Sequence, residues 1–428
     1  MLSSYFKLQE HSTNLKTEIT AGFTTFLTML YIVPLNALIL SQSGMPYDAL
    51  VTATIVVTFL ITLLNGIYSN TPVALSVGMG LNAYFTYGLV LGMKVPWQTA
   101  LGVVFISGVL FVLLSFTSFR RTLLNAIPES LRRAISAGIG AFLAFIGLKE
   151  IGIIASDKVT LVHLGDLSSP ETMLGIFGLV LVIILHSLRF KGAFIISIIA
   201  TTILAFATGN ATLPNVLFAL PASIEPIAFE LDILSALTLS MVPVIVAFLL
   251  TDMFDTLGTL GGIAQRAHIY KNDDRKLDNT LKSDAIGSVV GASLGVSTVT
   301  SFIESAAGVE VGGRTGLTAV ATALFFLPLL FMLPIFEAIP AVAIYPVLVM
   351  VGILMFEEIA HINFKDSATA VSAFFTILMI PLTFSITNGI AFGFLSFVLV
   401  KIVKKEYSSL NRGLIVLALI SLIIFWIQ

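Results

Sequence analysis

The chain has no cysteine, and only 11% of its 428 residues are charged. The lack of cysteine excludes disulfide bonds, thiolate catalysis and cysteine metal sites. The 5 histidines show neither an HExxH motif nor a paired spacing, so no metal site is expected. The net charge is -2, and phosphate binding needs a concentrated basic surface. The composition therefore argues against a nucleic-acid partner.

Apolar residues are abundant, at 57% of the chain with a mean hydropathy of +1.03. A globular protein has about 25% charged residues, far more than this chain. Apolar runs recur along the whole length, and each approaches the roughly 20 residues that cross about 30 Å of hydrocarbon. The polar N-terminal segment lacks the three regions of a signal peptide, so we expect no cleavage. These features predict an all-α polytopic protein embedded in the lipid bilayer.

The apolar segments between polar breaks predict two sets of seven spans, or about fourteen in all. The first set lies near residues 17–41, 49–68, 71–92, 97–118, 130–153, 171–188 and 192–209. The second set lies near residues 235–262, 280–295, 296–312, 314–334, 338–358, 367–385 and 387–404. The predicted divisions are an N-terminal tail 1–16, a first repeat 17–209, an outer connector 210–234, a second repeat 235–404 and a tail 405–428. The apolar part of that tail, 413–426, is compatible with a fifteenth span or with a packed or interfacial helix.

The orientation follows from the basic residues, because short cytoplasmic loops carry an excess of Lys and Arg. With the N-terminus inside, only Lys94, Lys149 and Lys158 of the 22 basic residues fall outside. The inside clusters are Arg120, Arg121, Arg132 and Arg133; Arg189 and Lys191; Arg266, Lys271, Arg275, Lys276 and Lys282; and Lys401, Lys404 and Lys405. We therefore predict a multi-pass protein of the inner or plasma membrane with a cytoplasmic N-terminus.

The two halves contain similar features in the same order. The third span is broken by Pro72, Gly78 and Gly80, and the tenth contains the extended-looking run VSTVTS. Asn82 and Glu304 follow these breaks at similar places. Seven is an odd number, so the two repeats must have opposite topology. Inverted repeats with broken helices at the midplane are typical of secondary transporters.

Two acidic residues, Asp255 and Glu304, lie inside otherwise apolar segments. A carboxylate at the bilayer centre costs about 2.5–3.5 kcal/mol on the insertion scale, and such residues often mark a substrate or proton path. Glu304 precedes a helical run, so its carboxylate could accept N–H groups while free amides of the helix start face substrate carbonyls or the carboxylate itself. A purely structural alternative is that Glu304 bonds to neighbouring hydroxyls and holds the break together.

Asp252 and Asp255 are three residues apart, so both can face one cavity from a single helix. Asp255 is followed by small polar residues that allow a ligand to approach, whereas Asp252 precedes Met253 and Phe254. We expect Asp255 to bind substrate or proton, and Asp252 to serve helix packing or proton relay. Removal from water favours the neutral form of a carboxylate, which suits proton uptake and release.

Two further residues are candidates for substrate contact. Asn82 offers one acceptor and two donors, which suits either direct contact with a heterocycle or a bridge between the broken helices. Phe302 could present its ring to a planar ligand, although ordinary packing explains it almost as well among 33 Phe. The GGRTG at 312–316 lacks the phosphate-loop spacing, which disfavours nucleotide binding.

The sequence resembles the nucleobase:cation symporters, in particular the azaguanine-permease-like (AzgA-like) purine permeases. The matching stretches are GFTTFLTMLYIVPLNALIL, NTPVALSVGMGLNAYF, TDMFDTLGTL and DAIGSVVGASLGVSTVTSFIESAAGVEVGGRTGLTAV. The resemblance implies a core and a gate domain, paired short strands in spans three and ten, and purine contacts at Asp255, Glu304 and Asn82. It also implies proton symport and a homodimer. The candidate proton carriers are Asp255, Glu304 and Asp252, and no bound cofactor is expected. One departure is that the family's Asn-Pro is Asn36-Ala37 here, with Pro34 two residues earlier.

Other functions stay open at this point. The same architecture could carry anions such as sulfate or bicarbonate, but two buried acids argue against that. A uracil or pyrimidine permease is a nearer alternative. An intramembrane aspartyl hydrolase built on Asp255 and Glu304 is a third, because paired carboxylates can share a proton. The sequence ranks neither adenine against guanine, hypoxanthine or xanthine, nor protons against sodium.

Overall fold

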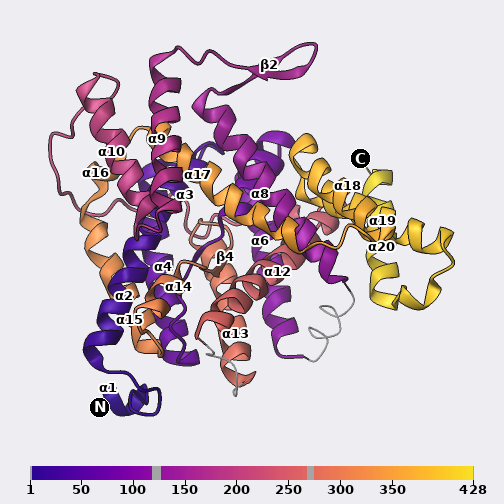
Figure 1. The fold of residues 1–428 in the computed structure, drawn as a ribbon, viewed down its shortest axis with the longest axis horizontal. Coiled ribbons are helices and arrows are strands. Elements are labelled where there is room, and N and C mark those ends of the chain that lie inside the picture. Colours follow the sequence, from indigo (N-terminus) through magenta and orange to yellow (C-terminus); the bar gives the residue numbers. More distant parts are fainter. Residues whose placement is uncertain (1, 118–126, 268–273, 428) are drawn as a thin grey trace.

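A computed structural model describes residues 2–117, 127–267 and 274–427, which are almost entirely helical (Figure 1). The elements of the first half are α1 (Leu2–Tyr5), α2 (Leu15–Met29), α3 (Ile32–Ser41), α4 (Tyr47–Ser69), β1 (Leu75–Val77), α5 (Met79–Ala83), the π-helix η1 (Tyr84–Gly92), α6 (Trp97–Ser115), α8 (Glu129–Ile151), β2 (Ile154–Asp157), β3 (Leu161–Leu164), α9 (Pro170–Ser187) and α10 (Ala193–Ala207).

The second half follows a long irregular connector. Its elements are α11 (Ile233–Ala236), α12 (Val242–Ala267), α13 (Asp274–Ser293), β4 (Val299–Ser301), α14 (Ser305–Glu310), α15 (Gly316–Phe326), η2 (Leu327–Phe331), α16 (Leu333–Glu337), α17 (Ala341–Phe356), η3 (Glu357–His361), α18 (Ser367–Thr383), α19 (Ile386–Val403), η4 (Tyr407–Ser409) and α20 (Arg412–Ile427).

In the described part of the chain, 8 helical segments are long and apolar enough to cross a membrane. Four shorter apolar helices include α10, α18 and part of α20. The predicted all-helical, multi-span class is therefore confirmed. The predicted number of about fourteen full spans is larger than the number of helices that meet the length and hydropathy criteria. The difference arises where spans are broken, as in the third and tenth, where helices are short, as in α10 and α18, and where a helix is more polar, as in α13. The apolar tail 413–426 forms the helix α20, which packs against α19.

The first span is interrupted between α2 and α3, at Leu30 and Tyr31. Pro34 explains the break, because a proline has no N–H to donate to the carbonyl four residues earlier, here that of Leu30. The interruption turns Tyr31 into the protein interior, where it is 1% exposed.

The predicted extended segments of the third and tenth spans are confirmed as strands. β1 and β4 pair antiparallel, with Leu75 opposite Ser301 and Val77 opposite Val299. Both strands are fully buried, and irregular backbone inside a membrane must be satisfied by protein. This two-stranded sheet holds the two broken spans together.

A helix hydroxyl satisfies the outer edge of each strand. On α4, Thr62 Oγ1 donates to the Leu75 carbonyl at 2.6 Å and accepts from the Leu75 N–H at 3.0 Å. On α13, Ser288 Oγ lies 3.0 Å from the Val299 carbonyl and accepts from the Val299 N–H at 3.1 Å. The same arrangement thus occurs once in each half of the chain.

The helices form two packing groups. In the first group, α4 packs on α13 and α15, α2 on α14 and α15, and α6 on α12 and α13. In the second group, α8 packs on α17 and α18, α18 on α19, and α9 on α10 and α17. Very close helix contacts occur within the groups, since a Cβ added to Gly140 of α8 would lie 2.5 Å from the Gly352 carbonyl of α17.

Candidate functional site

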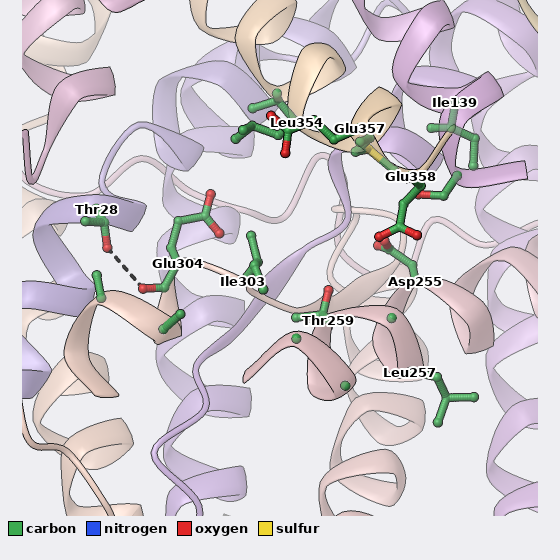
Figure 2. Close-up of a pocket in the computed structure, with 18 of the residues that line it drawn as sticks. Thr28, Ile139, Asp255, Leu257, Thr259, Ile303, Glu304, Leu354, Glu357 and Glu358 are labelled. Atoms are coloured by element: carbon green, nitrogen blue, oxygen red, sulfur yellow. Dashed lines mark hydrogen bonds between the residues drawn. The ribbon is translucent and has the colours of Figure 1, made fainter. Parts of the chain in front are cut away.

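A cavity of about 1320 Å³ lies between the two packing groups. The first group contributes Thr28, Asp255, Thr259 and Glu304, and the second contributes Ile139, Phe194 and Leu354. Figure 2 shows Glu304 and Asp255 on opposite sides of this pocket, with Ile303 and Thr259 between them in the view. The structure therefore brings the two predicted acids together at one cavity.

Glu304 lies in the turn between β4 and α14, and its side chain is half-buried. The Tyr31 hydroxyl donates to Glu304 Oε1 at 2.5 Å, and Thr28 Oγ1 lies 3.5 Å from the Glu304 carbonyl oxygen (Figure 2). A hydrogen bond this short to a charged acceptor is among the strong ones. Tyr31 thus fixes one oxygen of a carboxylate that lines the cavity.

Asp255 lies in the middle of α12 and is half-buried. Thr300 of β4 donates to Asp255 Oδ2 at 3.3 Å. The guanidinium of Arg132 lies 6.0 Å from the ring centroid of Phe254, the residue before Asp255, within the range of a cation–π contact. Asp255 therefore combines a cavity position with a hydrogen bond to the strand that precedes Glu304.

Asn82 bridges the broken spans. It is 0% exposed. Its amide nitrogen donates to Asn36 Oδ1 at 2.6 Å and to the Val296 carbonyl at 3.3 Å. Asn82 is not among the cavity-lining residues in the described part of the chain. Of the two roles left open by the sequence, this geometry supports the bridge.

Phe302 and Asp252 also lie away from the cavity lining formed by the described residues. Phe302 is 5% exposed and packs in the apolar core, so the predicted contact of its ring with a planar ligand has no geometric support. Asp252 is 1% exposed, and its Oδ2 lies 2.7 Å from the Ser288 hydroxyl oxygen. The side chain of Asp252 therefore faces the α12–α13 interface.

The start of α14 also differs from the expectation of free amides facing a substrate. The N–H groups of Ser305, Ala306 and Ala307 already donate to the carbonyls of the three residues Phe302, Ile303 and Glu304. A tight turn before the helix therefore pairs these three amides, so they are not free donors for a substrate.

Sequence reasoning missed two residues of this region. Tyr31 had no local signal, because its partner Glu304 lies 273 residues away. Asp284 is 0% exposed and accepts from Thr256 at 2.6 Å. Its neighbours Asp278 and Lys282 make the stretch resemble the polar end of a span, although α13 begins at Asp274.

The cavity lining also contains charged residues. Arg132, Arg133, Arg189 and Lys191 belong to it, together with the acids Glu129, Glu310, Glu357 and Glu358. Arg133 joins α8 to η3 through a 2.6 Å contact with Glu358. The four basic residues belong to the clusters predicted to be cytoplasmic, whereas Arg120, Arg121 and Lys271 of those clusters lie outside the described residues.

The fold is shared with solved membrane transport proteins. The transmembrane domain of a cyanobacterium bicarbonate transporter, BicA, aligns with a TM-score of 0.63 at 16% identity, covering 89% of this chain and 97% of that one. Murine Slc26a9, an anion transporter in the inward-facing state, aligns with a TM-score of 0.65 at 12% identity, covering 92% and 69%. These likenesses define the class as a multi-pass membrane protein of this transporter fold.

The chain belongs to the Xan_ur_permease family, a permease family whose model matches residues 16–392. A putative permease of Methanocaldococcus jannaschii is 45% identical over 98% of this chain and 97% of that protein. The guanine/hypoxanthine permease PbuO of Bacillus subtilis is 40% identical, covering 99% of both chains. The adenine permease AdeQ of Escherichia coli is 39% identical, covering 97% and 94%. The predicted resemblance is confirmed, and the protein is a transporter rather than an enzyme, so the hydrolase alternative is wrong.

Proposed function

We propose that this permease imports purine nucleobases, such as adenine, guanine, hypoxanthine or xanthine, across the cell membrane in symport with protons. The observation that carries the proposal is the presence of two carboxylates, Asp255 and Glu304, at one cavity between two packing groups. The names of the relatives, adenine permease and guanine/hypoxanthine permease, support the choice of substrate class.

The chemistry of the cavity suits a purine. A purine presents ring N–H groups as donors, and ionised carboxylates are acceptors only. Glu304 has one oxygen held by Tyr31 and a second oxygen for the ligand, while the Thr259 hydroxyl offers a donor and an acceptor. Apolar side chains such as Ile139 and Leu354 suit the flat faces of the base. A site with buried polar groups on a mostly apolar wall is the usual form of a small-molecule site.

The proposed mechanism is alternating access between two inverted repeats. Support comes from the antiparallel pairing of β1 with β4 and from the matched hydroxyls of Thr62 and Ser288, one from each half. The first packing group would be the core domain, and the second the gate domain. If the basic clusters lie inside, as their excess favours, the basic residues that line the cavity would place its opening on the cytoplasmic side, as expected for an inward-facing state. A homodimer remains part of the proposal through the family resemblance.

Uptake in cells that lack their own base permeases tests the function. Cells expressing this chain receive radiolabelled adenine, guanine, hypoxanthine, xanthine, uracil or sulfate, with and without a protonophore. We expect accumulation of one or more purines that the protonophore abolishes. Competition by unlabelled analogues then ranks the bases, and replacement of sodium in the medium separates proton from sodium coupling.

The main alternatives have distinct outcomes in the same assay. Uptake of sulfate without purines would support an anion transporter, for which the four basic residues of the cavity lining are the favourable feature. Uptake of uracil alone would support a pyrimidine permease. Either result would overturn the proposed purine import.

A further inference from the structure

Helices α12 and α13 are joined by two contacts between an acid and a hydroxyl. None of the four side chains belongs to the cavity lining formed by the described residues. Thr256 of α12 donates to Asp284 Oδ2 of α13 at 2.6 Å. One turn away on each helix, Ser288 of α13 contacts Asp252 Oδ2 of α12 at 2.7 Å. All four side chains are at most 1% exposed. The Oδ1 atoms of Asp252 and Asp284 have no hydrogen-bond partner among the described residues.

A chain of hydroxyls connects Asp284 to the cavity. Thr300 Oγ1 lies 3.3 Å from Asp255 Oδ2, and Thr256 Oγ1 lies 3.0 Å from Thr300 Oγ1. The 2.6 Å contact of Thr256 with Asp284 completes the chain. One end is the half-buried Asp255 in the cavity wall, and the other end is the fully buried Asp284.

The protons in this chain can be counted. It contains three oxygen–oxygen contacts, each of which needs one proton, and the hydroxyls of Thr256 and Thr300 supply one proton each. With both Asp255 and Asp284 ionised, both hydroxyls would point at the acids. The two threonine oxygens would then face each other at 3.0 Å without a proton between them. One extra proton, on either acid, satisfies every contact.

A similar count assigns a fixed proton to Asp252. Ser288 Oγ has one proton, yet it lies within hydrogen-bond distance of both the Val299 carbonyl and Asp252 Oδ2. On α4, the equivalent hydroxyl of Thr62 donates to the Leu75 carbonyl of β1 and accepts from the Leu75 N–H. No acid takes part in these two hydrogen bonds. If Ser288 does the same, Asp252 is the donor and is neutral. The acid whose proton can move is then Asp284.

The surroundings of Asp284 are acidic or uncharged. The elements that pack on α13 are α4, α6, α12 and the two strands. Within their described ranges, α6 and the strands contain no ionisable residue, and α4 contains only Asp48 and the tyrosines 47 and 68, near its ends. The ionisable groups of neighbouring elements that act on Asp284 are thus Asp252 and Asp255 of α12. A buried carboxylate with such neighbours is stable when it is protonated.

We propose that Asp284 stores the co-transported proton and exchanges it with Asp255 through the hydroxyls of Thr300 and Thr256. This proposal rests on the proton symport proposed above. In the transfer, the O–H bonds of Asp255, Thr300 and Thr256 break. New O–H bonds form on Thr300, Thr256 and Asp284. One proton is thereby transferred from the cavity wall to the buried Asp284, and Asp255 becomes ionised.

The relay couples the proton to the substrate. While Asp284 holds the proton, Asp255 is a carboxylate and can accept an N–H of a base in the cavity. When the base leaves, the proton returns to Asp255, from which it can escape into the cavity. Proton and substrate therefore occupy different acids in the loaded state, and each favours binding of the other.

Transport by the full-length protein in liposomes tests the relay. Thr256→Val removes one hydroxyl at nearly constant volume, and Thr256→Ser is the matched control that retains it. The probes are labelled adenine and labelled hypoxanthine. We expect Thr256→Val to lose proton-driven accumulation above equilibrium while one-for-one exchange at equal pH stays within about twofold of wild type, since exchange needs no net proton transfer. Thr256→Ser should restore accumulation.

Two transport results would overturn the relay. One is normal proton-driven accumulation by Thr256→Val. The other is loss of exchange as well as accumulation in Thr256→Val at wild-type membrane levels, since that indicates a packing contact only.

An infrared measurement separates failure of the relay from failure of the proposed function. Purified wild type should show the C=O stretch of a protonated carboxylic acid that Asp284→Asn removes and Thr256→Val shifts. If wild type carries no purine, the proposed function fails, but this band still reports the proton on Asp284. A wild-type spectrum unchanged by both substitutions would overturn the proton store, whatever the substrate.

Discussion

Removal of the Tyr31 hydroxyl should weaken substrate binding without abolishing transport. In Tyr31→Phe the ring keeps its edge contact with Phe194, whose centroid lies 4.9 Å away, but the 2.5 Å hydrogen bond to Glu304 is lost. A hydrogen bond to a charged group contributes about 1.5–3 kcal/mol, and each 1.4 kcal/mol is about tenfold in affinity. We therefore expect the KM for the transported base to rise about ten- to hundredfold, with the maximal rate little changed.

The assay is initial uptake of labelled adenine and hypoxanthine over a range of concentrations, at matched protein levels in the membrane. Tyr47→Phe is the control, because its hydroxyl donates to the Phe336 carbonyl at 3.2 Å and Tyr47 does not line the cavity formed by the described residues. A KM for Tyr31→Phe within twofold of wild type would refute the reasoning that Tyr31 orients Glu304.

Three further predictions concern coupling and stability. Asp255→Asn should uncouple uptake from the proton gradient, so the idea fails if a protonophore still collapses accumulation in the mutant as in wild type. Thr62→Val leaves the buried N–H and C=O of Leu75 unpaired, at about 1–3 kcal/mol each; the melting temperature in detergent should fall, and Thr62→Ser should restore it. Gly140→Ala forces a Cβ against the Gly352 carbonyl, at about 1–3 kcal/mol. Its melting temperature should fall below that of Gly258→Ala, where nothing lies within 4 Å of the added atom.

Much of the fold could be predicted from local patterns. Apolar length gave the membrane class, and the Val, Ser and Thr residues before Glu304 indicated the strand that β4 forms. The predicted ends of spans were less accurate where a helix continues into polar residues. The span predicted to begin near residue 280 is part of α13, which starts at Asp274. The break before α3 follows from Pro34, but its consequence, the burial of Tyr31, depends on packing that no local pattern contains.

The acids were recognisable for the same local reason. Asp255 and Glu304 stand out because apolar residues surround them, whereas Asp284 is hidden among polar neighbours in the sequence. The contacts that define the roles of these acids join residues far apart, such as Thr300 and Asp255, separated by 45 positions. Side-chain partners across helices require the folded arrangement, so sequence reasoning could name the acids but not the hydroxyls between them.

The central claim is that the carboxylate of Glu304 binds the transported base in the cavity. The most direct measurement is uptake of labelled purines by Glu304→Gln at a membrane level equal to that of wild type. Glu310→Gln is the control, since Glu310 also lines the cavity but is exposed to solvent. The account predicts no purine uptake by Glu304→Gln and near-normal uptake by Glu310→Gln. Normal uptake by Glu304→Gln would contradict it.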